Sequence, residues 1–142
     1  DSLDNNQIRS FQGIQWLENR GGFPFVHHQL TNLPGAYRAL GGDLDGDGDI
    51  DIAAVALLAG QTLAAWEGAE FDSVIWLEQK DPGRFVRHRI ESGTPKRSCL
   101  ELADLDQDGD IDICVSGYTL EPLDEPLARL TIYWNEPAAA DQ

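Results

Sequence analysis

The sequence is short of basic residues and of sulfur. It has ten Lys and Arg against 25 Asp and Glu, no Met, and two Cys among 142 residues, which gives a formal net charge of −15. A chain this acidic is a poor partner for nucleic acid or for an anionic membrane surface. No apolar run approaches the roughly 20 residues of a membrane-spanning helix, so we expect no direct insertion into a membrane.

Several motifs of reactive sites are also missing. Neither Cys99 nor Cys114 lies in a CxxC or CxxCH context, which excludes the common dithiol and covalent haem motifs. The two thiols allow one disulfide, and the sequence leaves its formation open. There is no GxSxG, no HExxH and no phosphate-binding glycine loop. A catalytic carboxylate pair stays an open alternative, because such pairs can lie far apart in sequence.

The residues that are present indicate one globular domain. Apolar residues make up 42% of the chain and aromatic residues 8%, which argues against the disordered class. The length suits a single core. Because the chain begins at Asp1 and lacks Met, we expect a processed or excised piece whose signal peptide would already be gone.

The sequence repeats with a period of about 60 residues. WLEN at 16–19 recurs as WLEQ at 76–79, and FVHHQL at 25–30 recurs as FVRHRI at 85–90. After one inserted residue, GDLDGDGDIDIAAVA at 42–56 aligns with ADLDQDGDIDICVSG at 103–117, and TIYWNE at 131–136 begins a third copy that places Trp134 58 residues after Trp76. We predict one repeat domain over residues 1–142, with a first repeat at about 14–73, a second at 74–130, and a partial third with a tail at 131–142.

No segment has a convincing helical pattern, so the predicted fold class is all-β. VIWLEQ and RFVRHRI alternate as half-buried strands do, whereas IDIAAVALL is apolar on both faces, as a central strand would be. Turns are marked by NRGG and KDPG, and the variable stretches 57–72 and 118–129 are expected to be surface insertions. About four strands per unit predict two β-propeller-type blades, each a four-stranded antiparallel unit, within a larger propeller or assembly. A calcium β-helix is less favoured, because its nonapeptide repeat is absent.

Two acidic loops, at residues 43–51 and 104–112, both fit the pattern DxDxDGxxD. Alternate carboxylates in a tight loop turn toward one point, where their repulsion is costly without a cation. Five or six protein oxygens favour calcium over magnesium, which keeps its waters and demands octahedral geometry. We therefore predict two Ca²⁺ sites. Their residues are Asp43, Asp45, Asp47, Asp49 and Asp51 in the first loop and Asp104, Asp106, Asp108, Asp110 and Asp112 in the second.

Single positions within the loops have separate expected roles. Asp49 and Asp110 are expected to contribute backbone carbonyls while their side chains face water, and Gly48 and Gly109 provide the sharp turn. An EF-hand is not favoured, because its bidentate Glu at position twelve is replaced by Ala54 or Val115 and the flanks are β-rich. The plainest alternative is a pair of acidic surface turns that bind nothing.

These loops, with the WLEN and FxxH strands, resemble FG-GAP/VCBS repeats, the blade units of integrin α-subunit-like β-propellers in many exported bacterial proteins. The resemblance covers nearly the whole chain. It implies that the first, third, fifth and ninth side chains of each loop ligate calcium on a hairpin-like loop between two blade strands. Propellers of this family usually have about seven blades, whereas this chain holds two full units plus fragments.

The repeated aromatic residues and histidines are predicted to build the repeat itself. His28 and His88 recur at equivalent places, which favours hydrogen-bonded structural roles over metal ligands, and His27 is expected to be exposed. Trp16, Trp76 and Trp134 recur with the unit and are predicted to be core or blade-interface residues.

Trp66 and a cluster of basic residues are open to two interpretations each. Trp66 lies in an insertion without a counterpart and either contacts a partner or sugar, or packs within its own loop. Half of the bases lie within 84–97, at Arg84, Arg87, Arg89, Lys96 and Arg97. We favour a solvated strand face that balances the Asp loop over a docking patch for an acidic partner.

We predict a non-catalytic, calcium-binding structural and interaction module of an exported protein or multi-chain assembly. Its expected location is extracytoplasmic, its expected partners are other protein chains or copies of itself, and carbohydrate is a further ligand class. Two alternatives stay open. One is a fragment of a carbohydrate-active lyase or hydrolase. The other is an accessory subunit of an extracytoplasmic electron-transfer complex, whose haem would belong to another chain because this one lacks CxxCH.

Overall fold

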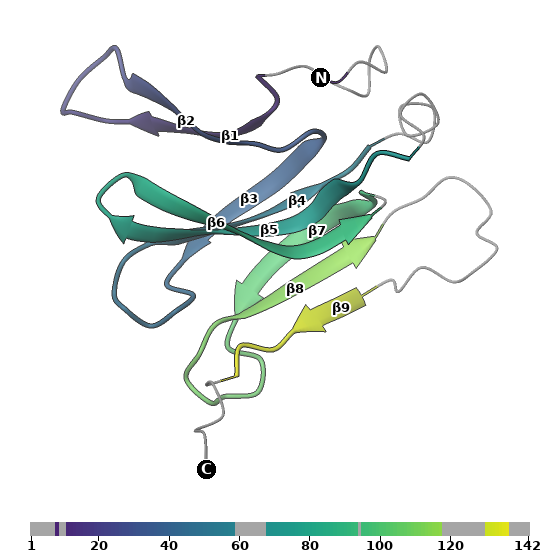
Figure 1. The fold of residues 1–142 in the computed structure, drawn as a ribbon. Coiled ribbons are helices and arrows are strands. Elements are labelled where there is room, and N and C mark those ends of the chain that lie inside the picture. Colours follow the sequence, from purple (N-terminus) through teal and green to yellow (C-terminus); the bar gives the residue numbers. More distant parts are fainter. Residues whose placement is uncertain (1–7, 9–10, 59–67, 94, 118–129, 137–142) are drawn as a thin grey trace.

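The computed structural model describes residues 8, 11–58, 68–93, 95–117 and 130–136. These residues form three antiparallel sheets with the strand orders β1–β2, β3–β4–β5–β6 and β7–β8–β9 (Figure 1). The strands are β1 (Gly13–Glu18), β2 (Val26–Asn32), β3 (Ala36–Gly42), β4 (Asp51–Ala56), β5 (Phe71–Asp81), β6 (Arg84–Gly93), β7 (Arg97–Ala103), β8 (Asp112–Gly117) and β9 (Leu130–Tyr133). The predicted all-β class is confirmed. The described residues include no helix long and apolar enough to cross a membrane.

The four-stranded sheet is the middle of three layers (Figure 1). Alternate residues of β4 face opposite ways and are fully buried. Ala53 and Val55 join the core that this sheet shares with the three-stranded sheet, whereas Ala54 and Ala56 join the core that it shares with β1 and the loop after β2. The prediction that the segment after the first Asp loop is apolar on both faces is therefore confirmed.

The two outer sheets are incomplete versions of the middle one. Leu17 pairs with His27 in the first sheet as Leu77 pairs with Arg87 in the second, so β1–β2 corresponds to β5–β6. On the other side, β7–β8 repeats β3–β4, because Leu102 pairs with Ile113 as Gly41 pairs with Ile52. Among the residues that the structure describes, the first sheet therefore lacks counterparts of β3 and β4, and the third sheet lacks a counterpart of β6.

The third copy is aligned differently from the sequence expectation. Ile52 pairs with Leu77 in the middle sheet, and its counterpart Ile113 pairs with Tyr133. Tyr133 thus occupies the place of Leu77, and Trp134 lies two positions beyond the place of Trp76. The expected match of these two tryptophans is wrong, because strand pairing, and not the shared Trp, sets the register.

A polar network joins the middle sheet to the three-stranded sheet. Arg97 donates from Nε to Glu91 Oε1 at 2.9 Å, and the Tyr133 hydroxyl donates to Glu91 Oε2 at 2.5 Å. Partial burial opposes ionisation of Glu91, but the hydrogen bonds from Arg97 and Tyr133 prevail and hold its pKa below the usual value. Partial burial, together with the bond to the Glu91 carboxylate, raises the pKa of Tyr133 to about 12. The network fixes how the two sheets pack.

We predict that Ile75→Ala destabilises the chain by about 2–5 kcal/mol, the usual cost of truncating a buried aliphatic side chain. Ile75 is fully buried between the first two sheets. Leu17→Ala is the control, because Leu17 is 59% exposed on β1, and it should change the free energy of unfolding by about 0.5 kcal/mol or less. Urea denaturation of both variants tests this, and equal losses would contradict the layered core.

Candidate metal centres

Each Asp loop connects the first two strands of its unit. The first runs between β3 and β4 and is closed by the pairing of Gly42 with Asp51; the second runs between β7 and β8 and is closed by the pairing of Ala103 with Asp112. Gly48 and Gly109 adopt φ values of 93° and 105°, a region that residues with a Cβ rarely adopt. The predicted turn at these two glycines is confirmed.

Three carboxylates converge in each loop. The groups are Asp43, Asp45 and Asp47 in the first loop and Asp104, Asp106 and Asp108 in the second. In each group, one oxygen from every carboxylate lies within 4.8 Å of the others. The sequence prediction that these side chains come together is confirmed, and each group can hold a metal ion.

Backbone hydrogen bonds hold the three carboxylates in place. Gly48 N–H donates to Asp43 Oδ2 at 3.0 Å, and Asp47 N–H donates to Asp45 Oδ1 at 3.2 Å. Asp49 N–H donates to Asp47 Oδ1 at 2.9 Å. The second loop repeats these bonds from Gly109, Asp108 and Asp110 at 3.2, 3.3 and 3.0 Å. Each carboxylate thus has one oxygen engaged by the loop backbone and a second that these bonds leave available.

One of those second oxygens lacks a partner. Asp43 Oδ1 is shielded from solvent and accepts no hydrogen bond. A buried carboxylate oxygen without a donor or a cation is costly. This atom therefore marks the first loop as a place where a cation would supply a missing interaction.

The last aspartate of each loop has a different environment from the triads. Asp51 and Asp112 are 0% and 1% exposed. Asp51 accepts from Leu44 N–H at 3.2 Å and from Gln79 N–H at 2.7 Å. Asp112 accepts from Leu105 N–H at 2.9 Å and from Asn135 N–H at 2.9 Å. Each carboxylate therefore links its loop to the third strand of its sheet or to the residues just after that strand. We call Asp51 and Asp112 the clasp aspartates.

Neither clasp aspartate belongs to a triad, and neither do Asp49 and Asp110, which are partly buried. The two clasp carboxylates still have lone pairs beyond the hydrogen bonds that they accept, since a carboxylate offers about four acceptor sites. Their predicted role as ligands, and the predicted backbone role of Asp49 and Asp110, stay predictions.

Desolvation and neighbouring negative charges both oppose ionisation within the triads. Partial desolvation raises the pKa of Asp45, the charges of Asp47 and Asp51 act in the same direction, and the hydrogen bond from Asp47 N–H opposes them. The same causes raise the pKa of Asp106. Both loops therefore hold carboxylates closer together than their charges favour.

A lysine that sequence reasoning missed lies beside the first loop. Lys80 Nζ is 4.0 Å from Asp45 Oδ2, and it also pairs with Glu78. The register places Glu136 at the corresponding point of the third sheet. The second unit therefore has an acidic residue where the first has Lys80. The signal for this lysine is weak, because Lys80 lies in a turn sequence that otherwise indicates only a reversal.

The repeated histidines are hydrogen-bonded, as predicted. His28 Nε2 lies 2.9 Å from Glu18 Oε2, and His88 Nε2 lies 2.7 Å from Glu78 Oε2. Trp16 and Trp76 stack on these rings, with centroid distances of 4.7 and 4.6 Å. The structural prediction for both histidines is confirmed. Glu18 and Glu78 belong to the repeated WLE motif. Sequence reasoning did not single them out, because a residue's type does not show which histidine it contacts.

The other predicted residues vary in their surroundings. Trp76 packs against the core, Trp16 is 37% exposed and Trp134 is 49% exposed. Trp134 is therefore not a core residue, and the alternative of a blade-interface position stays a prediction. His27 is exposed, as predicted. The two thiols are not bonded to each other, with Cys99 exposed and Cys114 partly buried. Trp66 and the stretch 118–129 lie outside the described residues.

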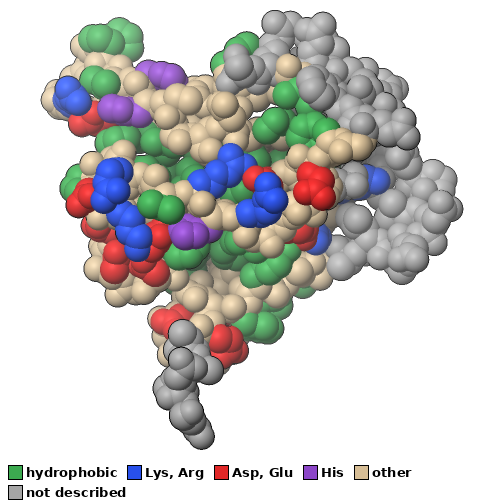
Figure 2. Space-filling model, in the orientation of Figure 1, with side chains coloured by type: hydrophobic (Ala, Val, Ile, Leu, Met, Phe, Trp, Pro, Cys, Tyr) green, Lys and Arg blue, Asp and Glu red, His purple; other side chains and the backbone are tan. Residues whose placement is uncertain are grey.

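Figure 2 shows Lys and Arg side chains next to Asp and Glu side chains across the middle of this face, and four arginines of the basic cluster pair with carboxylates of the middle sheet. Arg84 pairs with Asp81, Arg87 and Arg89 with Asp72, and Arg97 with Glu91. Each of these arginine charges is therefore balanced locally by a carboxylate on β5 or β6. The favoured interpretation as a solvated strand face fits the exposed Arg84, Arg87 and Arg89, but it is wrong for Arg97, which is 8% exposed. The charge next to the first Asp loop comes instead from Lys80.

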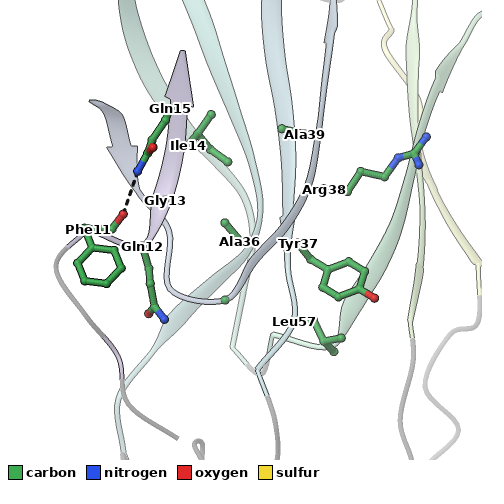
Figure 3. Close-up of a pocket in the computed structure, with 11 residues that line it drawn as sticks. Phe11, Gln12, Gly13, Ile14, Gln15, Ala36, Tyr37, Arg38, Ala39 and Leu57 are labelled. Carbon is green, nitrogen blue, oxygen red and sulfur yellow. Dashed lines mark hydrogen bonds between the residues drawn. The ribbon is translucent and has the colours of Figure 1, made fainter. Parts of the chain in front are cut away.

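A groove of about 620 Å³ separates β1 from β3 (Figure 3). Phe11, Gln12 and Gln15 lie on one side, and Tyr37 and Arg38 on the other. Gln15 Nε2 donates to the Phe11 carbonyl at 3.3 Å, and Arg38 pairs with Glu101. The described residues that line the groove include no Asp or Glu.

Comparison with models of protein families, with curated proteins and with solved structures finds no match to this chain. Its likeness to FG-GAP/VCBS repeats therefore stands on the sequence motifs, together with an all-β structure that has two acidic triads.

We predict that Asp112→Ala destabilises the chain even in the presence of a chelator. The change removes the carboxylate that accepts from the N–H groups of Leu105 and Asn135, and each hydrogen bond to a charged group contributes about 1.5–3 kcal/mol. Asp110→Ala is the matched control two residues away and should have a much smaller effect. Thermal melts in EGTA test the pair. If Asp112→Ala melts with the wild type in EGTA, the clasp is not a metal-independent part of the fold.

Proposed function

We propose that this chain is a non-catalytic structural and interaction module whose two Asp loops bind calcium. The observation that carries the proposal is the duplicated triad with converging oxygens. The unpartnered Asp43 Oδ1 supports it independently. A cation bound by hard oxygen ligands would relieve the repulsion within each triad, and flexible coordination by carboxylates and carbonyls suits calcium.

The fold supports a more specific architecture. A four-stranded antiparallel sheet with an incomplete sheet packed on each face fits consecutive blades of a β-propeller. In this proposal β3–β6 is one whole blade, β1–β2 is the outer half of the blade before it, and β7–β9 is most of the blade after it. Each loop then stiffens the turn between the first two strands of its blade. The FG-GAP/VCBS resemblance and an extracytoplasmic location, where calcium is plentiful, belong to the same proposal.

Calcium should act as a folding cofactor. We predict two bound ions per chain by calorimetric titration, and a melting temperature that falls when EGTA is added. A ligand that binds only the folded state stabilises it by about 2.7 kcal/mol per site at a hundredfold excess over its dissociation constant. The double variant D45N/D47N should bind one ion, and D106N/D108N should also bind one. An unchanged melt in EGTA, with no calcium bound in the titration, would refute the proposal.

Interaction with other copies is the second part of the proposal. The edge of β1 that faces the groove lacks an inner neighbour, and the outer edge of β9 lacks an outer one, among the described residues. Open edges are templates for pairing with another chain. The third sheet has counterparts of β3 and β4, which the first lacks, and the first has the counterpart of β6, which the third lacks, while β1 and β9 both correspond to β5 and would compete for that one place. Copies that complete one another's sheets in this way would associate head to tail.

We predict particles larger than the 15.7 kDa monomer in light scattering with calcium present. Ala39 is exposed and lines the groove, so Ala39→Glu should place a charge where the second chain docks and reduce the particle mass. Ser92→Glu, at an exposed site on β6, is the control with the same added charge and should leave the mass unchanged. A stable calcium-bound monomer at high protein concentration would contradict head-to-tail association.

A further inference from the structure

Asn135 lies between the two Asp loops and contacts both. Its side-chain amide donates to the carbonyl of Leu44 at 2.6 Å and to the carbonyl of Ile111 at 3.3 Å. Its backbone N–H donates to Asp112 Oδ1 at 2.9 Å. Leu44 is in the first loop, and Ile111 and Asp112 are in the second. One residue just beyond β9 therefore holds two loops that are 61 residues apart in sequence.

The surroundings of Asn135 confirm that the loops are neighbours. Both loops line a single cleft of about 500 Å³ together with Asn135, the first through Leu44 and Asp45 and the second through Asp110 and Ile111. Figure 1 shows the two loops at the same end of their sheets, next to the end of β9. A change in the mobility of one loop's backbone can therefore reach the other loop through few contacts.

The bridge is not a general feature of the repeat. Gln79 is the counterpart of Asn135 in the middle sheet, because its N–H donates to the clasp carboxylate of Asp51 at 2.7 Å. Its side-chain oxygen, however, accepts from Gly83 N–H at 3.2 Å, within its own turn. The amide of Asn135 instead reaches the neighbouring unit. The backbone bond to the clasp aspartate is common to both units, whereas the bridge to the first loop depends on the Asn side chain at position 135.

We propose that Asn135 is a positioning residue that couples the two cation loops, so that calcium in one loop raises the calcium affinity of the other. The inference rests on the proposed calcium function. The path consists of three hydrogen bonds: the Asn135 amide donates to the Leu44 carbonyl, the Asn135 N–H donates to Asp112 Oδ1, and the Leu105 N–H donates to Asp112 Oδ2.

The two ends of this path occupy equivalent positions. Leu44 lies between Asp43 and Asp45, and Leu105 lies between Asp104 and Asp106. An ion that draws two neighbouring carboxylates onto itself also fixes the peptide groups between them. Ordering the first loop therefore restricts the amide of Asn135 and, through Asp112, the backbone of the second loop. The second ion then orders a loop that has already lost part of its freedom, and linkage makes the effect equal in both directions.

Calorimetric Ca²⁺ titrations of six proteins measure the coupling, three with Asn135 present and three with Asn135→Ala. The wild type gives the overall constant for two ions, and D106N/D108N and D45N/D47N give the constants of the first and second loops alone. The coupling factor is the overall constant divided by the product of the two single-loop constants. We expect a factor of at least about fivefold with Asn135 present. The other three proteins are Asn135→Ala alone and Asn135→Ala combined with each loop variant, and the factor that they give should be near one.

Two further variants separate the bridge from general effects. Asn135→Asp keeps the size of the side chain and the backbone bond but removes the amide donor, so its factor should also be near one. Glu101→Gln weakens the 2.7 Å pair between Arg38 on β3 and Glu101 on β7, which joins the same two sheets away from the loops, and it should keep the wild-type factor. Circular dichroism in EGTA checks that each variant is folded.

The outcomes distinguish the coupling from the proposed function. If neither loop binds calcium, the proposed function fails and the coupling with it. If both loops bind and the wild-type factor is near one, only the coupling is overturned. A factor that survives in both Asn135 variants but falls with added salt would assign it to charge acting through space, which also overturns the role of Asn135.

Discussion

The buried carboxylates of Asp51 and Asp112 are the constraint on which the rest of the structure depends. A carboxylate at 0% or 1% exposure is tolerated only when its oxygens are hydrogen-bonded or paired. Each one accepts an N–H from its own loop and another from the chain at the third strand. In each unit this one aspartate therefore closes the loop, begins the second strand and helps to fix the register of the third strand. The triads lie where they do because the loop around them is closed in this way.

The layering follows from the same unit. The central strands of the middle sheet, β4 and β5, have buried residues on both faces, and the small residues Ala53 and Ala54 let the two outer sheets approach closely. A two-stranded sheet is marginal by itself in water, so β1–β2 depends on the contacts of Ile14 and Leu33 with the middle sheet. Stacking thus makes each sheet stable only through its neighbours. It also leaves open edges at both ends of the stack, among the described residues, and this is why the proposed function includes association.

Sequence reasoning identified the features that are local or repeated. The Asp triads, the turn glycines and the two-sided burial of β4 follow from patterns within about ten residues. The hydrogen-bonded histidines follow from repetition. What it missed depends on contacts between distant segments. The shared Trp suggested that Trp134 matches Trp76, but the register follows the bond from Asn135 to Asp112. Asn135 itself has no sequence signal, because its role comes from two loops that only the packing of the sheets brings together.

The two loops share a motif but not an environment. Lys80 lies 4.0 Å from Asp45, so the first triad already has a cation near it, whereas Glu136 occupies the corresponding position beside the second. The second loop also has Gln107 at φ 67° where the first has Gly46 at φ 74°, and a residue with a Cβ is strained in this region. A bound cation would thus displace a weak competitor in the first loop and offset both repulsion and strain in the second. Two loops with nearly the same sequence can therefore bind calcium with different affinities. A contact that links the loops would bring their calcium occupancies closer together.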